Sequence, residues 1–241
     1  MSPYWRAARS PRYSLTFALP LLIGYEVLAR LLSGPDGSGV RNGADVLLKS
    51  LFILLGGQHG LTLFALVLLG TGTALVIRDR KKNGPIEGRY FLGMAVEAVC
   101  YAVLFGLVTS LLTGLLLHGA SALALGPLDQ QSFPTRVMVS LGAGVYEELL
   151  FRVLIVGALA RMAAGLFHWT PFGAGAFATL TGAVIFSVFH YIGPLGDTPD
   201  LISFTFRTVA GLLLSALYLL RGFGITAWTH ALYDVLVSLH A

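Results

Sequence analysis

Charged residues are scarce in this chain, and most of what remains is hydrophobic. Of its 241 residues, 12% are Asp, Glu, Lys or Arg and 56% are hydrophobic, whereas a soluble domain carries about 25% charged residues. The mean hydropathy is +0.78. Several apolar runs reach or approach the roughly 20 residues that a helix needs to cross a bilayer. The composition excludes an ordinary soluble domain and predicts a polytopic membrane protein.

The chain has almost no cysteine, and its apolar runs show little alternation of apolar and polar residues. The single cysteine, Cys100, lies in an apolar run, so an intramolecular disulfide is excluded. The apolar runs are continuous, whereas the strands of a membrane barrel alternate apolar with polar residues. Because backbone groups in a bilayer must pair within helices or a closed barrel, we expect an all-α transmembrane bundle of about seven or eight helices.

Seven long apolar segments and one short one carry this pattern. We expect membrane helices at roughly 13–33, 60–77, 90–118, 135–163, 172–191, 200–220 and 223–240, with a shorter helix near 44–56. At about 13 residues, the short segment suits an interfacial or re-entrant helix better than a full crossing. No spacer separates two domains, so the N-terminal helices (1–134) and the C-terminal helices (135–241) should form one membrane domain.

Basic residues are gathered at Arg6, Arg9 and Arg12 and in the loop 78–82. The net charge of +4 could suggest a nucleic-acid partner. Clusters beside membrane helices instead record topology, because Lys and Arg accumulate on the cytoplasmic side. We therefore expect membrane lipids and no nucleic acid as partners, and a cytoplasmic N-terminus.

The first apolar run has the basic start of a signal peptide but lacks its ending. Glu26 interrupts the run, and Arg30 follows it where a small-residue cleavage site would be expected. We expect a retained first helix. Glu26 and Arg30 are four residues apart, so they can pair on one face near its end.

The charges inside the C-terminal helices begin with Glu147, Glu148 and Arg152. A charge at mid-bilayer costs on the order of 2.5–3.5 kcal/mol on insertion scales. An α-helix turns about 100° per residue, so Glu148 and Arg152 lie on nearly one face and Glu147 points away. We expect Arg152 to neutralise Glu148, leaving Glu147 to face a cavity as a general base. A buried triad that only holds helices together is the structural alternative.

Two histidines lie on later helices. His190 ends the run Phe186–His190, where a lone histidine is more often an interfacial polar residue. His230 and Asp234 are four residues apart and share a face. Asp234 either orients the imidazole by accepting its N–H or shares a target with it. Between these sites, Arg207 either binds a substrate carboxylate or, as we favour, pairs with an acidic neighbour.

Three motifs therefore occur in order on separate helices: Glu-Glu-x-x-x-Arg at 147–152, Phe-x-x-x-His at 186–190 and His-x-x-x-Asp at 230–234. This set resembles the CPBP family, the CAAX-type prenyl endopeptidases and bacteriocin-processing or immunity proteins also called Abi proteins. The likeness covers about residues 135–240.

The resemblance implies a glutamate-type intramembrane endopeptidase. It assigns water activation to Glu147 and water positioning or proton transfer to His190. It assigns oxyanion stabilisation to His230 with Asp234. Glu148 and Arg152 match the remaining positions of the first motif and would support the site.

Asp234 departs from many members of the family, which carry Asn there. An amide can donate to an oxyanion but an ionised carboxylate cannot, so we favour an orienting role towards His230. Asp also leaves a zinc site open, because Glu147, His190, His230 and Asp234 are acceptable ligands. There is no His-Glu-x-x-His signature. We favour a site without a cofactor and keep zinc as the alternative.

The expected reaction is hydrolysis of a peptide bond in a membrane-associated protein or peptide. The substrate would be hydrophobic, lipidated or tagged at its C-terminus, and the enzyme would lie in a bacterial cytoplasmic membrane. The alternative is a non-catalytic bacteriocin-immunity or membrane scaffold protein. A transporter that uses the buried carboxylates as a proton relay is a more distant third.

Overall fold

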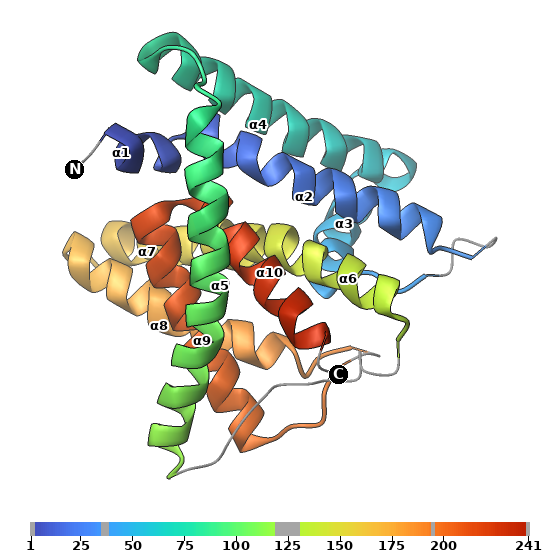
Figure 1. Ribbon diagram of the computed structural model, residues 1–241, viewed down its shortest axis with the longest axis vertical. Coiled ribbons are helices and arrows are strands. Elements are labelled where there is room, and N and C mark those ends of the chain that lie inside the picture. Colours follow the sequence, from blue (N-terminus) through green and yellow to red (C-terminus); the bar gives the residue numbers. More distant parts are fainter. Residues whose placement is uncertain (1–2, 35–38, 119–130, 194–195, 240–241) are drawn as a thin grey trace.

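The computed structural model describes residues 3–34, 39–118, 131–193 and 196–239 (Figure 1). Every regular element in these residues is a helix, which confirms the all-α prediction. The elements are α1 (Pro3–Arg9), α2 (Pro11–Leu31), α3 (Gly43–Gly56), the 3₁₀ turn η1 (Gly57–His59), α4 (Gly60–Asn83), α5 (Arg89–Leu116), α6 (Phe133–Gly142), the π-helix η3 (Ala143–Val156), α7 (Gly157–Leu166), α8 (Pro171–Phe189), α9 (Leu201–Arg221) and α10 (Phe223–Ser238).

Six stretches of the described residues are long and apolar enough to cross a membrane, judged by length and composition. They are Pro11–Leu31, Gly43–Asn83, Arg89–Leu116, Phe133–Leu166, Pro171–Phe189 and Leu201–Arg221. All eight expected apolar segments are helical, but α10 has only 16 residues and is not among the six. Large apolar side chains such as Leu54 and Phe172 lie on the outside, 82% and 87% exposed, as lipid-facing side chains do. The protein is a polytopic helical bundle of the membrane.

The short apolar segment forms α3, which packs against α4 after the turn η1. Glycine makes this turn possible. Gly57 has a φ of 53°, and a Cβ on Gly60 would lie 2.4 Å from the Cα atom of Ile53. The interfacial or re-entrant placement of α3 stays a prediction.

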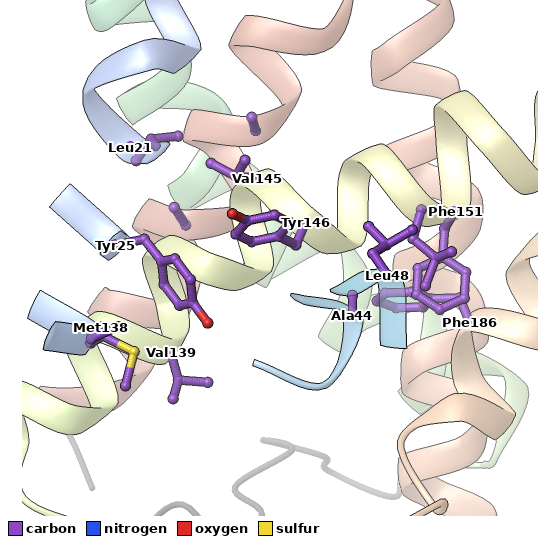
Figure 2. Close-up of a cluster of buried hydrophobic side chains, with 14 of the residues drawn as sticks. Leu21, Tyr25, Ala44, Leu48, Met138, Val139, Val145, Tyr146, Phe151 and Phe186 are labelled. Atoms are coloured by element: carbon purple, nitrogen blue, oxygen red, sulfur yellow. The ribbon is translucent and has the colours of Figure 1, made fainter. Parts of the chain in front are cut away.

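The helices α6, η3 and α7 form one continuous stretch that carries the first motif (Figure 1). Its neighbours include α2, α3, α8 and α10. Since α2 and α3 come from the N-terminal part, both parts of the chain lie against this stretch, although the division near residue 134 stays a prediction. Buried side chains from these elements form a core along η3 (Figure 2), which includes Leu21, Tyr25, Leu48, Met138, Val145, Tyr146, Phe151 and Phe186.

The backbone of η3 is a π-helix, which pairs residues five apart instead of four and occurs often at functional sites. The rotation of 100° per residue expected for this segment is therefore wrong. The wider turn still keeps residues four apart on nearly the same side. For this reason the expected pairing of Glu148 with Arg152 survives the change in helix type.

Candidate active site

Glu147 is buried within η3, and its two carboxylate oxygens have different surroundings. Oε1 accepts a hydrogen bond of 2.8 Å from the side-chain amide of Asn42. Oε2 has no hydrogen-bond partner among the described residues. It lies 3.9 Å from Nε2 of His190. One oxygen is thus held by the protein, and the other faces an imidazole.

His190 lies at the C-terminal end of α8, directly after Phe189. Its Nδ1 atom is 2.8 Å from the backbone oxygen of Phe186. A carbonyl oxygen can only accept, so Nδ1 carries the proton in this contact. The neutral ring therefore presents an unprotonated Nε2 to Glu147, which is the atom that can take up a proton.

Glu148 lies at the centre of a second group, fully buried beside Arg152 and His230. Its Oε2 atom is 3.2 Å from Nε of Arg152, the pairing expected from their spacing. Its Oε1 atom is 2.7 Å from Nδ1 of His230, a contact that the spacing did not predict. The guanidinium of Arg152 also lies 4.5 Å from the ring centre of Phe186. Glu148 therefore links the first motif to the third.

Asp234 is farther from His230 than Glu148 is. Its Oδ2 atom lies 3.6 Å from Nε2 of the ring, beyond a normal hydrogen bond. Because Glu148 holds Nδ1, the imidazole is oriented from η3, and Asp234 contributes its charge on the other side of the ring.

Glycine lets α10 come this close to η3. A Cβ on Gly144 would lie 2.4 Å from the backbone oxygen of Ala227 and 2.8 Å from Cβ of Ala231. Any larger residue at position 144 would push α10 away, and the contact between Glu148 and His230 depends on that separation.

The four side chains differ in exposure. Those of Glu147 and His230 are 8% and 7% exposed, whereas those of His190 and Asp234 are 26% and 29% exposed. Water would therefore reach Glu147 past His190, its more exposed neighbour.

Two further pairings were expected from the sequence, and one was wrong. Arg207 forms an ion pair with Asp197, as favoured. Glu26 does not pair with Arg30, which is exposed. It contacts Lys49 at 2.8 Å and Arg41 at 3.5 Å instead. Packing of α3 against this part of the bundle brings those two cations closer to Glu26 than its neighbour on α2.

The contact of Asn42 with Glu147 had no counterpart in the sequence analysis. Asn42 precedes Gly43 and Asp45 at the start of an apolar run, a pattern typical of a helix N-cap. That signal could have found the cap of α3, but not the bond that the same side chain makes to Glu147.

Metal binding gains no geometric support from the part of the chain that is described. Within it, no three His, Cys, Asp or Glu side chains converge on a point that could hold a metal ion. The amide of Asn42 also occupies Oε1 of Glu147. Metal dependence stays a matter for experiment, and no step below uses a metal.

Acidic and imidazole side chains buried among membrane helices define a polytopic membrane protein with a polar centre suited to hydrolysis. Residues 129–236 match the family described as type II CAAX prenyl endopeptidase Rce1-like. This match confirms the resemblance drawn from the three motifs of the C-terminal helices. No curated protein and no solved structure matches the chain. The match and the six apolar stretches together support a multi-pass integral membrane protein that is similar to CAAX proteases.

Proposed function

We propose that this protein is a glutamate-type intramembrane endopeptidase in which Glu147 activates the attacking water. The observation that supports this most directly is the unpartnered Oε2 atom of Glu147, buried and 3.9 Å from Nε2 of His190. A water at hydrogen-bond distance from both atoms would form an angle of about 88° between them, which a water molecule accommodates. That water would be held between a carboxylate and an unprotonated imidazole nitrogen.

In the proposed reaction, the carboxylate of Glu147 takes a proton from this water as its oxygen attacks the peptide carbonyl carbon. The carbonyl double bond opens and its electron pair moves to the oxygen, giving a tetrahedral oxyanion. When the carbon–nitrogen bond breaks, the leaving amine receives the proton that Glu147 took up. His190 orients the water and relays that proton. Each turnover consumes one water and restores the carboxylate.

His230 would stabilise the oxyanion as an imidazolium. Its Nδ1 proton points at Glu148, so donation by Nε2 to an oxyanion requires a second ring proton. Carboxylates on both sides of the ring, at 2.7 Å and 3.6 Å, favour that charged form. Glu148 thus supports the reaction through His230, and Arg152 balances the charge of Glu148.

A purely structural role for these residues, as in an immunity or scaffold protein, explains the pair of Glu148 and Arg152. Oε2 of Glu148 also has no hydrogen bond, but the charge of Arg152 at 3.2 Å compensates it; Oε2 of Glu147 has only the imidazole of His190 at 3.9 Å. A buried acceptor without a partner costs about 1–3 kcal/mol, which a structural site has no reason to keep. A hydrolase keeps it because water and substrate complete the contact.

For the substrate, we propose a membrane-associated peptide or protein that is hydrophobic or lipidated near its C-terminus. The description of the family names CAAX prenyl endopeptidases. In a CAAX segment a prenylated cysteine is followed by three residues. An internally quenched peptide with a farnesylated cysteine and this ending is therefore the first probe, and a bacterial cytoplasmic membrane is the expected location.

The test is Glu147→Gln, which keeps the shape and removes the base. We expect cleavage of the quenched peptide to fall about 10²–10⁴-fold, the usual contribution of a general base, with normal abundance and thermal unfolding. Glu87→Gln is the matched control, because the side chain of Glu87 is 47% exposed and pairs with Arg89. Full activity of Glu147→Gln would refute the proposal. For the native substrate, Glu147→Gln in its own membrane can be crosslinked to what accumulates on it.

A further inference from the structure

Asn42 lies outside the segment that matches the family, yet it donates to the proposed catalytic carboxylate. We propose that Asn42 is a positioning residue that holds Oε1 of Glu147, so that Oε2 faces His190 and the water. This inference rests on the proposed function. It adds a residue from the N-terminal helices to a site that the three motifs place only in the C-terminal ones.

The orientation of the Asn42 amide follows from its contacts. Its Oδ1 atom accepts from the backbone nitrogens of Ala44 at 2.9 Å and Asp45 at 3.4 Å, as the N-cap of α3. The amide oxygen therefore accepts hydrogen bonds from the backbone of α3. The group 2.8 Å from Glu147 is the NH₂ group, which donates. The side chain is buried, at 3% exposure, so water does not compete easily for this bond.

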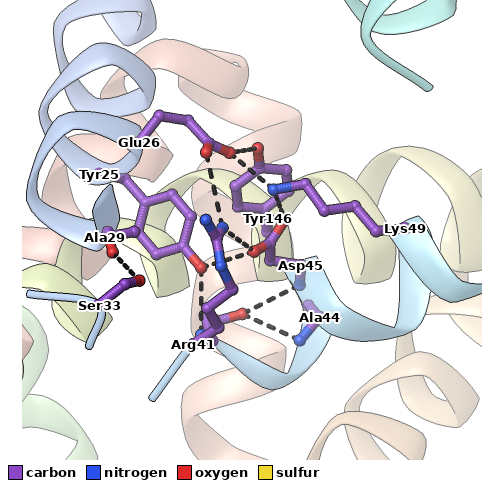
Figure 3. A network of polar contacts seen from close by, with 10 residues as sticks. Tyr25, Glu26, Ala29, Ser33, Arg41, Ala44, Asp45, Lys49 and Tyr146 are labelled. Atoms are coloured by element: carbon purple, nitrogen blue, oxygen red, sulfur yellow. Dashed lines mark hydrogen bonds and ion pairs between the residues drawn. The ribbon is translucent and has the colours of Figure 1, made fainter. Parts of the chain in front are cut away.

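A polar network anchors the start of α3 (Figure 3), and the backbone and side chain of Asn42 contact it. The hydroxyl of Tyr25 accepts from the backbone nitrogen of Asn42 at 3.2 Å and donates to Asp45 at 2.7 Å. Asp45 also pairs with Arg41 at 2.9 Å and Lys49 at 2.7 Å. With Glu26 included, two carboxylates face two cations, so the charge of the fully buried Asp45 is compensated.

The same network reaches the residue next to Glu147. Lys49 is 2.8 Å from Glu26, and the hydroxyl of Tyr146 donates to Glu26 at 2.7 Å (Figure 3). Both sides of the Asn42–Glu147 hydrogen bond therefore contact the same group of charged residues. The start of α3, which carries Asn42, does so through Tyr25 and Asp45. The helix η3, which carries Glu147, does so through Tyr146.

Gly142 allows the two segments to approach. A Cβ at this position would lie 2.8 Å from Cβ of Asn42 and 2.6 Å from Cε2 of Tyr25. The contact between Asn42 and Glu147 thus depends on a glycine one turn before the carboxylate.

Without the amide, the buried carboxylate of Glu147 would lose its only protein hydrogen bond in the described residues and could rotate towards the charge of Arg152. Oε2 would then no longer face His190. A misplacement of about 1 Å at a reacting group can cost on the order of 100-fold in rate. The loss should appear in kcat and not in KM, because Asn42 positions Glu147 and is not expected to contact the substrate.

Two substitutions separate positioning from helix capping. Asn42→Ser keeps an N-cap acceptor but loses the amide donor. Asn42→Asp keeps the shape and the cap but sets a carboxylate against Glu147. Using the quenched farnesylated peptide, we expect kcat per folded enzyme to fall about 10-fold for Ser and about 100-fold for Asp, with KM near that of the wild type and with lower thermal stability, because a buried acceptor loses its donor. Thr170→Ala, which removes the exposed N-cap of α8, is the control and should keep full kcat.

The outcomes distinguish the two proposals. If Glu147→Gln is inactive but Asn42→Asp keeps the wild-type kcat, the inference on Asn42 is wrong and the proposed function stands. If both variants are fully active, the proposed function fails. Loss of stability in the Asn42 variants with unchanged kcat per folded enzyme would show a structural role only and would also overturn the inference.

A spectroscopic measurement needs no substrate. The infrared difference between the wild type and Glu147→Gln isolates the carboxylate band of Glu147. Asn42→Ser should shift that band, because one oxygen loses its hydrogen bond. An unchanged band would contradict the proposed contact, whatever the activity assay gives.

Discussion

Replacing Gly144 by alanine tests how closely α10 must pack on η3. The new Cβ would lie 2.4 Å from the backbone oxygen of Ala227 and 2.8 Å from Cβ of Ala231. An ordinary van der Waals contact begins at 3.4 Å, so the helices must separate by about 1 Å. The 2.7 Å contact between Glu148 and His230 would then stretch to about 3.7 Å and cease to be a hydrogen bond.

The expected cost of Gly144→Ala lies in the reaction more than in the fold. Overpacking costs about 1–3 kcal/mol, and replacing a helical glycine by alanine returns about 1 kcal/mol, which leaves a net loss of about 0–2 kcal/mol. A site displaced by about 1 Å should lose on the order of 100-fold in kcat. Cleavage of the quenched farnesylated peptide and thermal unfolding in detergent, measured on the same preparation, separate the two effects.

Gly175→Ala is the matched control. It makes the same change in α8, where a Cβ would meet nothing within 4 Å, so it should leave cleavage unchanged and raise stability by about 1 kcal/mol. If Gly144→Ala cleaves the peptide as fast as the wild type, the close approach of α10 to η3 is not needed, and the role given to the contact between Glu148 and His230 is refuted.

Three further predictions concern charge and metal at the site. Arg152→Met leaves Glu148 buried without its cation and should cost about 3–5 kcal/mol; thermal unfolding should show it, and a variant as stable as the wild type would contradict the ion pair. Asp234→Asn should keep kcat within about 10-fold of the wild type, because Glu148 still holds His230 and an amide can donate to an oxyanion; a loss beyond about 100-fold would show that the carboxylate itself is required. Exhaustive chelation should leave peptide cleavage unchanged, since Oε1 of Glu147 already accepts a hydrogen bond; activity that is lost and then restored by zinc would refute the metal-free mechanism.

Contacts within one helix could be predicted from the sequence, whereas contacts between distant helices could not. Glu148 and Arg152 are four residues apart, and that spacing alone predicts their pairing. Asn42 is 105 residues from Glu147, and no local pattern joins them. The i,i+4 rule also failed for Glu26, because the packing of α3 supplies closer cations than Arg30.

The π-helical backbone of η3 could not be predicted from the sequence either. Apolar composition predicts a membrane helix at 135–163, and the structure has a helix there. Residue types alone do not specify whether its backbone pairs residues four or five apart. The order of the three motifs predicted the family whose model matches residues 129–236, but the contact of His230 with Glu148 could be seen only in the fold.

The residues that contact Glu147 and Glu148 are synthesised at different times. Asn42 is synthesised before Glu147, and Arg152 follows Glu148 in the same helix, whereas His230 is 82 residues later than Glu148. At about 5–20 residues per second, ribosomes need roughly 4 to 16 s to reach that histidine. During this interval Asn42, the partner of Glu147, has already been synthesised. Arg152, the partner of Glu148, follows four residues later in the same helix. The contacts with Asn42 and Arg152 would therefore make a helix with two acids tolerable to the insertion machinery before His230 is synthesised.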